Sequence, residues 1–179
     1  MGRANKVFIA ASLDGCIADR NDGLAWLNSV PNPDNIDMGY ADFMEDIDAI
    51  IMGRITFETV CNFDVDWPYN KPVFVLSRSL KQLNHEYQDK AELMGGSPEN
   101  ILNVIYKRGY KVLYIDGGST IQNFLKEDLI DELIITTIPI LLGGGSRLFS
   151  DLPEELEFEL VDSNVYLNQV VQNHYKRKR

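Results

Sequence analysis

The sequence is short of the residues that mark secreted, metal-binding and membrane-spanning proteins. Its 179 residues include two cysteines, Cys16 and Cys61, which lie far apart in differently patterned segments. Such a pair supports neither a disulfide framework nor a zinc site, so we expect two packed thiols and no bound metal. No stretch is long and apolar enough to cross a bilayer, and residues 1–6 lack the apolar core of a signal peptide. We therefore expect a cytoplasmic protein with no membrane partner.

Positive charge is also scarce, with 17 Lys and Arg residues against 27 Asp and Glu residues and a net charge of −10. This excess of acid argues against a general nucleic-acid surface. The basic end at residues 176–179 is local, and we expect it to be a solvated tail. With 45% hydrophobic and 25% charged residues, the composition is that of a globular protein whose length suits one domain, residues 1–179.

What the sequence does contain, twice, is an apolar run that stops at glycine before a helical pattern begins. The first run is 49–52, followed by Gly53, and the second is 112–115, followed after Asp116 by Gly117. Each pattern indicates a buried strand that turns into a helix N-terminus, whose free N–H groups and partial positive charge favour anions such as phosphate. Two junctions favour a ligand with more than one phosphate, above all a dinucleotide, although each alone is also typical of an ordinary strand–helix turn.

Apolar periodicity predicts alternating strands and helices along most of the chain. After residue 153 the pattern changes to an alternation that predicts an antiparallel hairpin with its turn at 162–164. This order indicates an α/β fold with a mostly parallel central sheet and an antiparallel C-terminal hairpin. The predicted strands cover 6–12, 48–52, 73–76, 112–115 and 132–138, and the predicted helices cover 40–47, the residues after Gly53, 97–109 and 121–126.

In this order the chain resembles the dihydrofolate reductase-like superfamily. It looks closest to the riboflavin-biosynthesis reductase branch, the C-terminal domain of the bacterial bifunctional deaminase-reductase. The resemblance rests on residues 10–18 (AASLDGCIA), 51–58 (IMGRITFE), 75–78 (VLSR), 115–119 (IDGGS) and 138–149 (IPILLGGGSRLF). It implies the three-layer fold of that superfamily. The zinc-deaminase signature of the bifunctional enzyme is absent, so only the reductase half is expected.

The resemblance implies NADPH as the cofactor, bound along the carboxyl ends of the strands. Helix N–H groups with a guanidinium suit a bridging phosphate, and Ser77 and Arg78 at a strand end would face the 2′-phosphate that distinguishes NADPH from NADH. Arg78 could instead form a surface salt bridge, and Ala10 and Ile17, which match nicotinamide contacts, could equally be plain core. The residues with an implied cofactor role are Ala10, Ile17, Gly53, Arg54, Thr56, Leu76, Ser77, Arg78, Gly117, Gly118, Ser119 and Thr120.

The substrate side is less clearly marked. Asp37 best matches the carboxylate that the folate enzymes place in the pterin pocket, and it would contact substrate and act as the catalytic proton donor, with an ordered water as the other candidate. It can equally cap a helix that starts near Met38. Trp26 resembles a pocket tryptophan, one residue out of register, and would contact substrate or else anchor its loop. Asp116 could repel a phosphate or cap the glycine loop from outside.

These features predict an NADPH-dependent reductase that transfers a hydride to a C=N or C=O of a pterin or folate, or of a 5-amino-6-(5-phosphoribosylamino)uracil-like substrate. The alternative is a catalytically silent nucleotide-binding or interaction protein on the same fold. The acidic residues 34–48 offer no site for a ribose phosphate, unless Arg147 or Lys71 reaches the pocket. The resemblance also implies a homodimer, with the apolar stretch 134–142 as its interface or as a buried strand.

Overall fold

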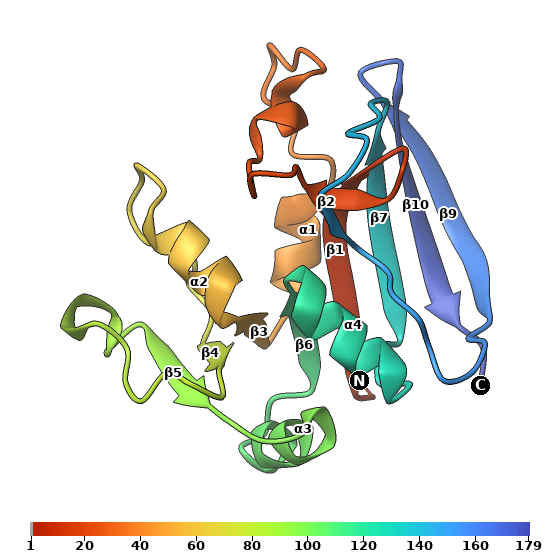
Figure 1. Cartoon of the computed structure of the whole chain (residues 1–179). Helices are drawn as coiled ribbons and strands as arrows, with labels where there is room; N and C mark the ends of the chain where they lie inside the picture. Colours follow the sequence, from red (N-terminus) through yellow and green to blue (C-terminus); the bar gives the residue numbers. More distant parts are fainter. Residues whose placement is uncertain (1) are drawn as a thin grey trace.

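The computed structural model describes residues 2–179, which form an eight-stranded sheet with helices on both faces and a separate two-stranded ribbon (Figure 1). The strands are β1 (Ala4–Ser12), β2 (Cys16–Ala18), β3 (Ala49–Gly53), β4 (Val73–Leu76), β5 (Ala91–Met94), β6 (Val112–Asp116), β7 (Glu132–Ile138), β8 (Ser146–Arg147), β9 (Phe158–Tyr166) and β10 (Val170–Arg177). The helices are α1 (Tyr40–Glu45), α2 (Arg54–Cys61), α3 (Pro98–Lys107) and α4 (Gly118–Lys126), with 3₁₀ turns η1 (Ala25–Asn28) and η2 (His85–Tyr87).

The sheet has the strand order β5-β4-β3-β6-β1-β7-β10-β9. All neighbours from β5 to β7 are parallel, whereas β10 runs antiparallel to both β7 and β9. The prediction of a mostly parallel sheet that ends in an antiparallel hairpin is therefore confirmed. The short ribbon pairs β2 with β8 beside the carboxyl end of β1.

Two hydrophobic cores, one on each face of the sheet, produce the three layers. Ile51 and Ile115 are neighbours in β3 and β6 and belong to the core covered by α3 and α4. The next residue of β3 and the preceding residue of β6, Met52 and Tyr114, belong to the opposite core with Phe43 of α1. Because both faces are buried, these central strands are apolar without alternation, as their sequence predicts.

The C-terminal hairpin differs from the prediction in the position of its turn. Strand β9 continues through residues 162–164, and the chain turns at Leu167 and Asn168, whose φ angles are 51° and 60°. Asn tolerates this left-handed conformation better than most residues. The polar residues upstream remain in the strand because β9 is a solvent-exposed edge, where Ser163 Oγ donates to Asn173 Oδ1 at 2.7 Å.

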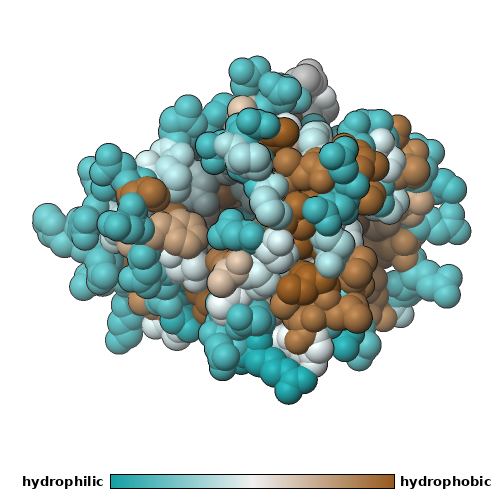
Figure 2. Space-filling view, turned by 90° about the horizontal axis from the view of Figure 1, so that it is seen from above, coloured by the Kyte–Doolittle hydropathy of each residue, from teal (hydrophilic) through white to brown (hydrophobic). Residues whose placement is uncertain are grey.

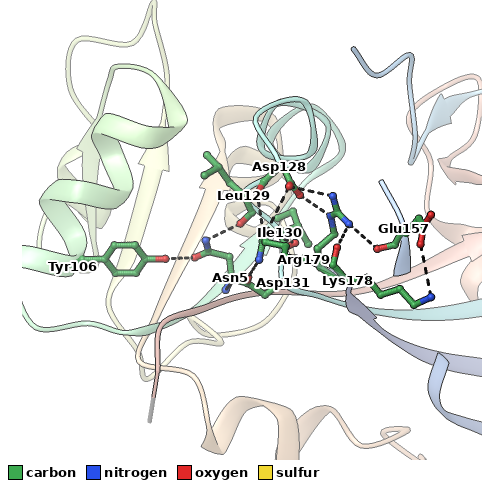
Figure 3. A network of polar contacts seen from close by, with 10 residues as sticks. Asn5, Tyr106, Asp128, Leu129, Ile130, Asp131, Glu157, Lys178 and Arg179 are labelled. Carbon is green, nitrogen blue, oxygen red and sulfur yellow. Dashed lines mark hydrogen bonds and ion pairs between the residues drawn. The ribbon is translucent and has the colours of Figure 1, made fainter. Parts of the chain in front are cut away.

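The basic C-terminal segment is not the solvated tail that its charge predicts (Figure 3). Arg177 Nε donates to Asp128 Oδ1 at 2.7 Å, and the Arg177 side chain is only 11% exposed. Arg179 donates to the Asp128 carbonyl at 2.7 Å and pairs with Asp131. Asp131 in turn accepts the N–H of Asn5 at 2.7 Å. The charged residues therefore fasten the last strand to the loop before β7 and to the start of β1.

Residues 2–179 contain neither a helix that could cross a membrane nor a side-chain cluster that could hold a metal ion. None of the helices described there has the length and apolarity needed to cross a membrane. The same residues contain no group of three or more His, Cys, Asp or Glu side chains that could hold a metal ion. Cys16 is buried and Cys61 is half-buried, and both are free thiols.

Candidate functional site

A large cleft opens at the carboxyl ends of the parallel strands, the edge of the sheet onto which Figure 2 looks. It has a volume of about 890 Å³. Its walls come from the ends of β1, β3, β4, β5 and β6, from the first turns of α2, α3 and α4, and from residues of the β2–β8 ribbon. Open α/β sheets bind ligands at this edge, so the cleft is the candidate site.

Gly53 and Gly117 bring the two predicted strand–helix junctions together in this cleft. A Cβ on Gly117 would lie 2.3 Å from Thr56 Oγ1, and a Cβ on Gly53 would lie 2.9 Å from Thr120 Oγ1. Each glycine thus faces the first turn of the other junction's helix, and the absence of a side chain permits the close approach. Gly117 has a φ of +91°, which also favours glycine. The two junctions form one continuous surface.

Helices α2 and α4 begin at this surface, and within the described residues no side chain caps either of them. The first N–H groups of a helix lack partners inside the helix and carry partial positive charge. Two such helix ends lie next to each other, because the glycine of each junction contacts the helix of the other. The arrangement can accept two phosphate groups a short distance apart.

A third junction of the same kind borders the cleft and is missed by the sequence prediction. Strand β5 ends at Met94, and Gly95 and Gly96 line the cleft before α3 begins at Pro98. A Cβ on Gly95 would lie 3.5 Å from the Ser77 carbonyl oxygen. The signal is present as a short run followed by two glycines and a Ser-Pro helix start. The run is only four residues long and includes a glutamate, so it does not stand out as a strand.

Ser77 and Arg78 follow β4 and line the cleft between the first and the third junction. Ser77 Oγ accepts hydrogen bonds from the N–H groups of Ser79 at 3.2 Å and Leu80 at 2.9 Å, which fixes the turn. Arg78 is exposed, and no residue that the structure describes forms an ion pair with it. The alternative role of Arg78 in a surface salt bridge is therefore not found among the described residues. Its guanidinium is free to bind an anion.

Arg54, by contrast, has a partner on its own helix. Its Nη1 donates to both carboxylate oxygens of Glu58 at 2.9 Å, four residues along α2. The pair is half exposed, so the guanidinium can exchange this contact for a stronger anion at small cost. Arg54 therefore lies where a phosphate at the start of α2 would meet it.

Asp14 holds the wall of the cleft that faces α4. Its carboxylate accepts a hydrogen bond from Ser12 Oγ at 2.6 Å and others from the N–H groups of Leu142 at 3.1 Å and Gly143 at 2.8 Å. The bonds from Ser12, Leu142 and Gly143 lower the pKa of Asp14 from 3.8 to about 2. The loop after β1 is thereby tied to the loop before β8.

This tie places Ile17 of β2 against the start of α4. A Cβ on Gly118 would lie 2.7 Å from Ile17 Cδ1, and both residues line the cleft together with Ala10 at the end of β1. Gln122 of α4 donates to the Arg147 carbonyl at 2.8 Å, which fixes β8 over the same helix. The result is an apolar wall beside the Gly117–Gly118 turn.

Asp116 contributes a carboxyl group to the cleft on the α1 side of the sheet. Its Oδ1 accepts a hydrogen bond from the N–H of Gly117 at 2.8 Å. This geometry matches the sequence interpretation in which Asp116 caps the glycine loop. Burial raises its pKa from 3.8 to about 6, against the opposing hydrogen bonds of Gly117 and Tyr114. Burial, and then the charge of Asp116, also raise the pKa values of Tyr40, Tyr69 and Tyr114. The Asp116 carboxyl therefore titrates near pH 6, whereas the neighbouring phenols stay neutral at that pH.

Trp26 lies directly behind the wall of the cleft. Its sequence neighbours Leu24 and Leu27 line the cleft, whereas its own ring is 7% exposed and packs in a small core with Val30 and Val170. Among residues 2–179, Trp26 Nε1 is the buried side-chain polar atom that lacks a hydrogen-bond partner. A buried donor without a partner is costly to stability.

Asp37 lies on the surface outside the residues that line the cleft. Its carboxylate accepts the N–H groups of Ala41 at 2.9 Å and Gly39 at 3.0 Å, and these two bonds lower its pKa. They satisfy donors at the start of α1, which begins at Tyr40. The geometry is that of the helix-capping alternative.

The structure gathers the predicted cofactor residues and separates them from the predicted substrate residues. Neither Trp26 nor Asp37 lines the cleft. Every residue with an implied cofactor role does line it, namely Ala10, Ile17, Gly53, Arg54, Thr56, Leu76, Ser77, Arg78, Gly117, Gly118, Ser119 and Thr120.

Comparison with known proteins gives consistent relatives. The family model of the RibD C-terminal domain matches residues 6–172. The uncharacterized protein YwjB of Bacillus subtilis (strain 168) is 34% identical over 180 residues, which cover 99% of each chain. The crystal structure of a putative riboflavin biosynthesis protein from Shewanella sp. PV-4 is 53% identical, covers 98% of this chain and 99% of its own, and has a TM-score of 0.96.

A more distant structure shares the fold. Dihydrofolate reductase from Enterococcus faecalis, complexed with NADP(H), is 18% identical, covers 98% of this chain and 97% of its own, and has a TM-score of 0.68. The matched family model spans most of the chain, and the sheet, its strand order and the terminal hairpin agree with this fold. The chain therefore belongs to the RibD C-terminal domain family, and it has the fold of dihydrofolate reductase.

Proposed function

We propose that the protein is an NADPH-dependent reductase that transfers a hydride to a C=N or C=O of a heterocyclic substrate, of the pterin or folate type or of the 5-amino-6-(5-phosphoribosylamino)uracil type. The observation that carries the proposal is the contact of the two glycine junctions. It presents the ends of α2 and α4 to one cleft beside Ser77 and Arg78. A dinucleotide with a 2′-phosphate has anionic groups that match these three places.

The donor set suits NADPH. The N-terminal turn of α2, with Gly53, Arg54 and Thr56, would hold the pyrophosphate, and Gly118, Ser119 and Thr120 of α4 would hold the second phosphate and the nicotinamide ribose. A cradle that a Cβ would fill, as at Gly117, supports a close approach of this kind. When bound, the cofactor supplies the hydride, and the protein holds donor and acceptor together and excludes water.

Ser77 and Arg78 would select the cofactor. Arg78 has an exposed guanidinium, and Ser77 Oγ already accepts two backbone hydrogen bonds, so its hydroxyl hydrogen is left to donate. Charge-assisted hydrogen bonds of this type favour a phosphate over the hydroxyl that NADH carries at the same position. Ala10 and Ile17, on the apolar wall, would contact the nicotinamide ring.

Reduction also needs a proton, for which two carboxyl groups are candidates. Asp37 remains the candidate that the family resemblance implies, and a rearrangement of the loop before α1 would have to bring it to the substrate. We favour Asp116 because it lines the cleft and has a pKa of about 6, so a fraction of the carboxyl is protonated near neutral pH. Trp26 remains the substrate contact that the resemblance implies, and movement of the residues between its ring and the cleft would have to bring its unpaired Nε1–H to the substrate.

The test is to titrate the purified protein with NADPH and with NADH by thermal shift, and then to follow loss of reduced-nicotinamide absorbance with a panel of pterin, folate and aminouracil substrates. Stabilisation by NADPH and turnover of one substrate class are expected. Absence of both effects would refute the proposal. Stabilisation by NADPH without turnover of any substrate would favour the alternative, a catalytically silent nucleotide-binding protein. The position of Asp37 outside the cleft is the observation that supports this alternative.

A homodimer is part of the proposal, with a changed interface. Residues 134–138 lie in β7, whose backbone is paired on both sides, so this stretch offers no free edge. The outer strand β9 instead exposes Leu160 (58%), Val161 (54%) and Val165 (64%). Hydrophobic residues also gather on the β7–β10–β9 side of the face in Figure 2. Sedimentation should give a dimer at micromolar concentration and a monomer for the Leu160→Lys/Val165→Lys variant, whereas a monomeric wild type would contradict the proposal.

A further inference from the structure

A tyrosine forms part of the cleft lining on the α1 face of the sheet. Tyr69 lies in the loop between α2 and β4, and it lines the cleft. Its ring packs edge-on against Trp67 with 5.3 Å between the centroids, and Trp67 packs in the same way on Phe57 of α2 at 6.0 Å. All three side chains belong to the core under α1. These contacts hold the ring of Tyr69 in a half-buried position at the cleft.

The hydroxyl group of Tyr69 forms no hydrogen bond with residues 2–179, although a buried phenol usually finds a partner. Three other phenols donate to an oxygen of the chain, namely Tyr87 to the Cys61 carbonyl at 3.3 Å, Tyr106 to Asn5 Oδ1 at 2.8 Å and Tyr114 to the Phe8 carbonyl at 2.9 Å. In the described residues the fully enclosed polar side-chain atom without a partner is Trp26 Nε1, so the Tyr69 hydroxyl is not enclosed. Because Tyr69 lines the cleft, its hydroxyl is open to a bound molecule.

The carboxyl group of Asp116 lies on the same face of the sheet as Tyr69. Asp116 follows Tyr114 by two residues in β6, and side chains two residues apart in a strand share a face. Tyr114 and Tyr69 belong to the same core, and Asp116 and Tyr69 both line the cleft. Burial, and then the charge of Asp116, raise the pKa of Tyr69, so the phenol stays protonated and can donate a hydrogen bond. A neutral donor and a carboxyl group therefore border one part of the cleft.

The proposed cofactor position leaves this part of the cleft to the substrate. Ile17 packs with the core covered by α3 and α4, and with Gly118 it forms the wall assigned to the nicotinamide end of the cofactor. Asp116 directly precedes the Gly117 turn, so its carboxyl group lies beside that wall and on the α1 side of it. A ring that receives the hydride must contact the nicotinamide, and the space for it on the α1 side is bordered by Asp116 and Tyr69.

We propose that Tyr69 is a substrate-binding residue whose hydroxyl donates a hydrogen bond to a ring carbonyl oxygen of the heterocycle, on the edge of the ring that faces Asp116. The inference rests on the proposed reductase function, because that function places the substrate beside the cofactor. It makes Tyr69 a determinant of specificity. A heterocycle with a ring carbonyl satisfies the phenol, whereas an analogue with an amino group in place of the carbonyl gives the hydroxyl hydrogen no acceptor.

Binding of matched ligands tests the proposal without any need for turnover. Two pairs differ by amino groups in place of carbonyl oxygens, pterin with 2,4-diaminopteridine and 5,6-diaminouracil with 2,4,5,6-tetraaminopyrimidine. Each compound is titrated by calorimetry into the full chain saturated with NADP⁺. Tyr69→Phe removes only the hydroxyl, so it should weaken binding of the carbonyl compound about 3- to 10-fold and change binding of its amino partner less than about twofold. Unchanged binding of the carbonyl compounds, equal losses within a pair, or no binding of either carbonyl compound to the wild type would overturn the proposal.

Tyr87→Phe is the matched control for the loss of a phenol hydroxyl. Tyr87 packs on the same Trp67 ring at 5.7 Å but does not line the cleft, so this variant should leave binding of every ligand unchanged. Tyr69→Phe loses no hydrogen bond within residues 2–179, and its midpoint of thermal unfolding without ligand should equal that of the wild type. A lower midpoint together with equal losses for both members of a pair would show a structural role and overturn the proposal. Failure of NADP⁺ and NADPH to bind the wild type would instead show that the proposed function itself is wrong.

Discussion

The contact between the two glycine junctions can be tested by Gly117→Ala. Gly117 has a φ of +91°, and an added Cβ would lie 2.3 Å from Thr56 Oγ1 and 3.3 Å from Thr56 Cβ. A left-handed conformation costs a residue with a Cβ about 1–2 kcal/mol. Relief of the collision requires rotation of Thr56 or movement of the helix, which adds about 1–3 kcal/mol. We expect Gly117→Ala to lower the free energy of unfolding by about 2–5 kcal/mol.

Gly109 provides a control for the cost of a positive φ. Its φ is +96°, close to that of Gly117, but a Cβ there would have no atom within 4 Å. Gly109→Ala should therefore lose only the conformational part, about 1–2 kcal/mol, and should leave NADPH binding unchanged. The difference between the two variants contains the collision and the added backbone cost of the extended ψ of 136° at Gly117.

A second substitution tests whether Thr56 is the colliding residue. Thr56→Ala removes the Oγ1 atom that the new Cβ would meet at 2.3 Å, so the Gly117→Ala/Thr56→Ala variant should recover about 1 kcal/mol or more relative to the sum of the single changes. Urea denaturation gives the free energies, and a thermal shift with NADPH gives the effect on binding. Equal losses for Gly109→Ala and Gly117→Ala, or strict additivity with Thr56→Ala, would refute the proposed contact.

Three further predictions concern charged residues. Arg177→Gln should lower the free energy of unfolding by about 1–3 kcal/mol, because it removes a mostly buried guanidinium that donates to Asp128 Oδ1 and to the Glu157 carbonyl, whereas the exposed Lys178→Gln should change it by less than about 0.5 kcal/mol; equal urea midpoints would contradict the fastening of β10. Asp116 has its pKa raised by burial from 3.8 to about 6, so the folded state holds the proton more tightly and stability falls as pH rises from about 4 to 6, by about 3 kcal/mol relative to Asp116→Asn; the opposite slope in the difference would reject the buried carboxyl. Arg78→Ala should weaken NADPH binding about 10- to 100-fold and leave NADH binding nearly unchanged, and equal losses for both would exclude a 2′-phosphate contact.

How well an element can be predicted from the sequence depends on its surroundings in the sheet. Strands β3 and β6 are buried on both faces, so their apolar runs are continuous and their ends at glycine are plain. Strand β5 is an edge strand of four residues that includes Glu92, and its pattern does not differ from a loop. Edge strand β9 accepts polar residues throughout, which is why the pattern places the hairpin turn too early.

The candidate site divides in the same way. The residues predicted to bind the cofactor lie at strand ends and helix starts, where local chain geometry fixes their position, so the sequence locates the cleft they line. The substrate side depends on contacts between distant segments. Asp37 shows the difference, because its local role as a cap is visible in the sequence, whereas its distance from the cleft depends on how α1 packs on the sheet.

The sequence alone determined the order of most elements, the mostly parallel sheet and two of the three places where a strand ends in glycine before a helix. These are local properties, which follow from apolar periodicity and from backbone angles. Only the tertiary structure decided that Gly53 and Gly117 face each other's helices, and that Asp116 lies half-buried near Tyr40, Tyr69 and Tyr114. Only the tertiary structure likewise decided that Arg177 and Arg179 fasten the last strand to Asp128 and Asp131. Close packing and burial depend on segments far apart in the chain, and no local pattern records which of them will meet.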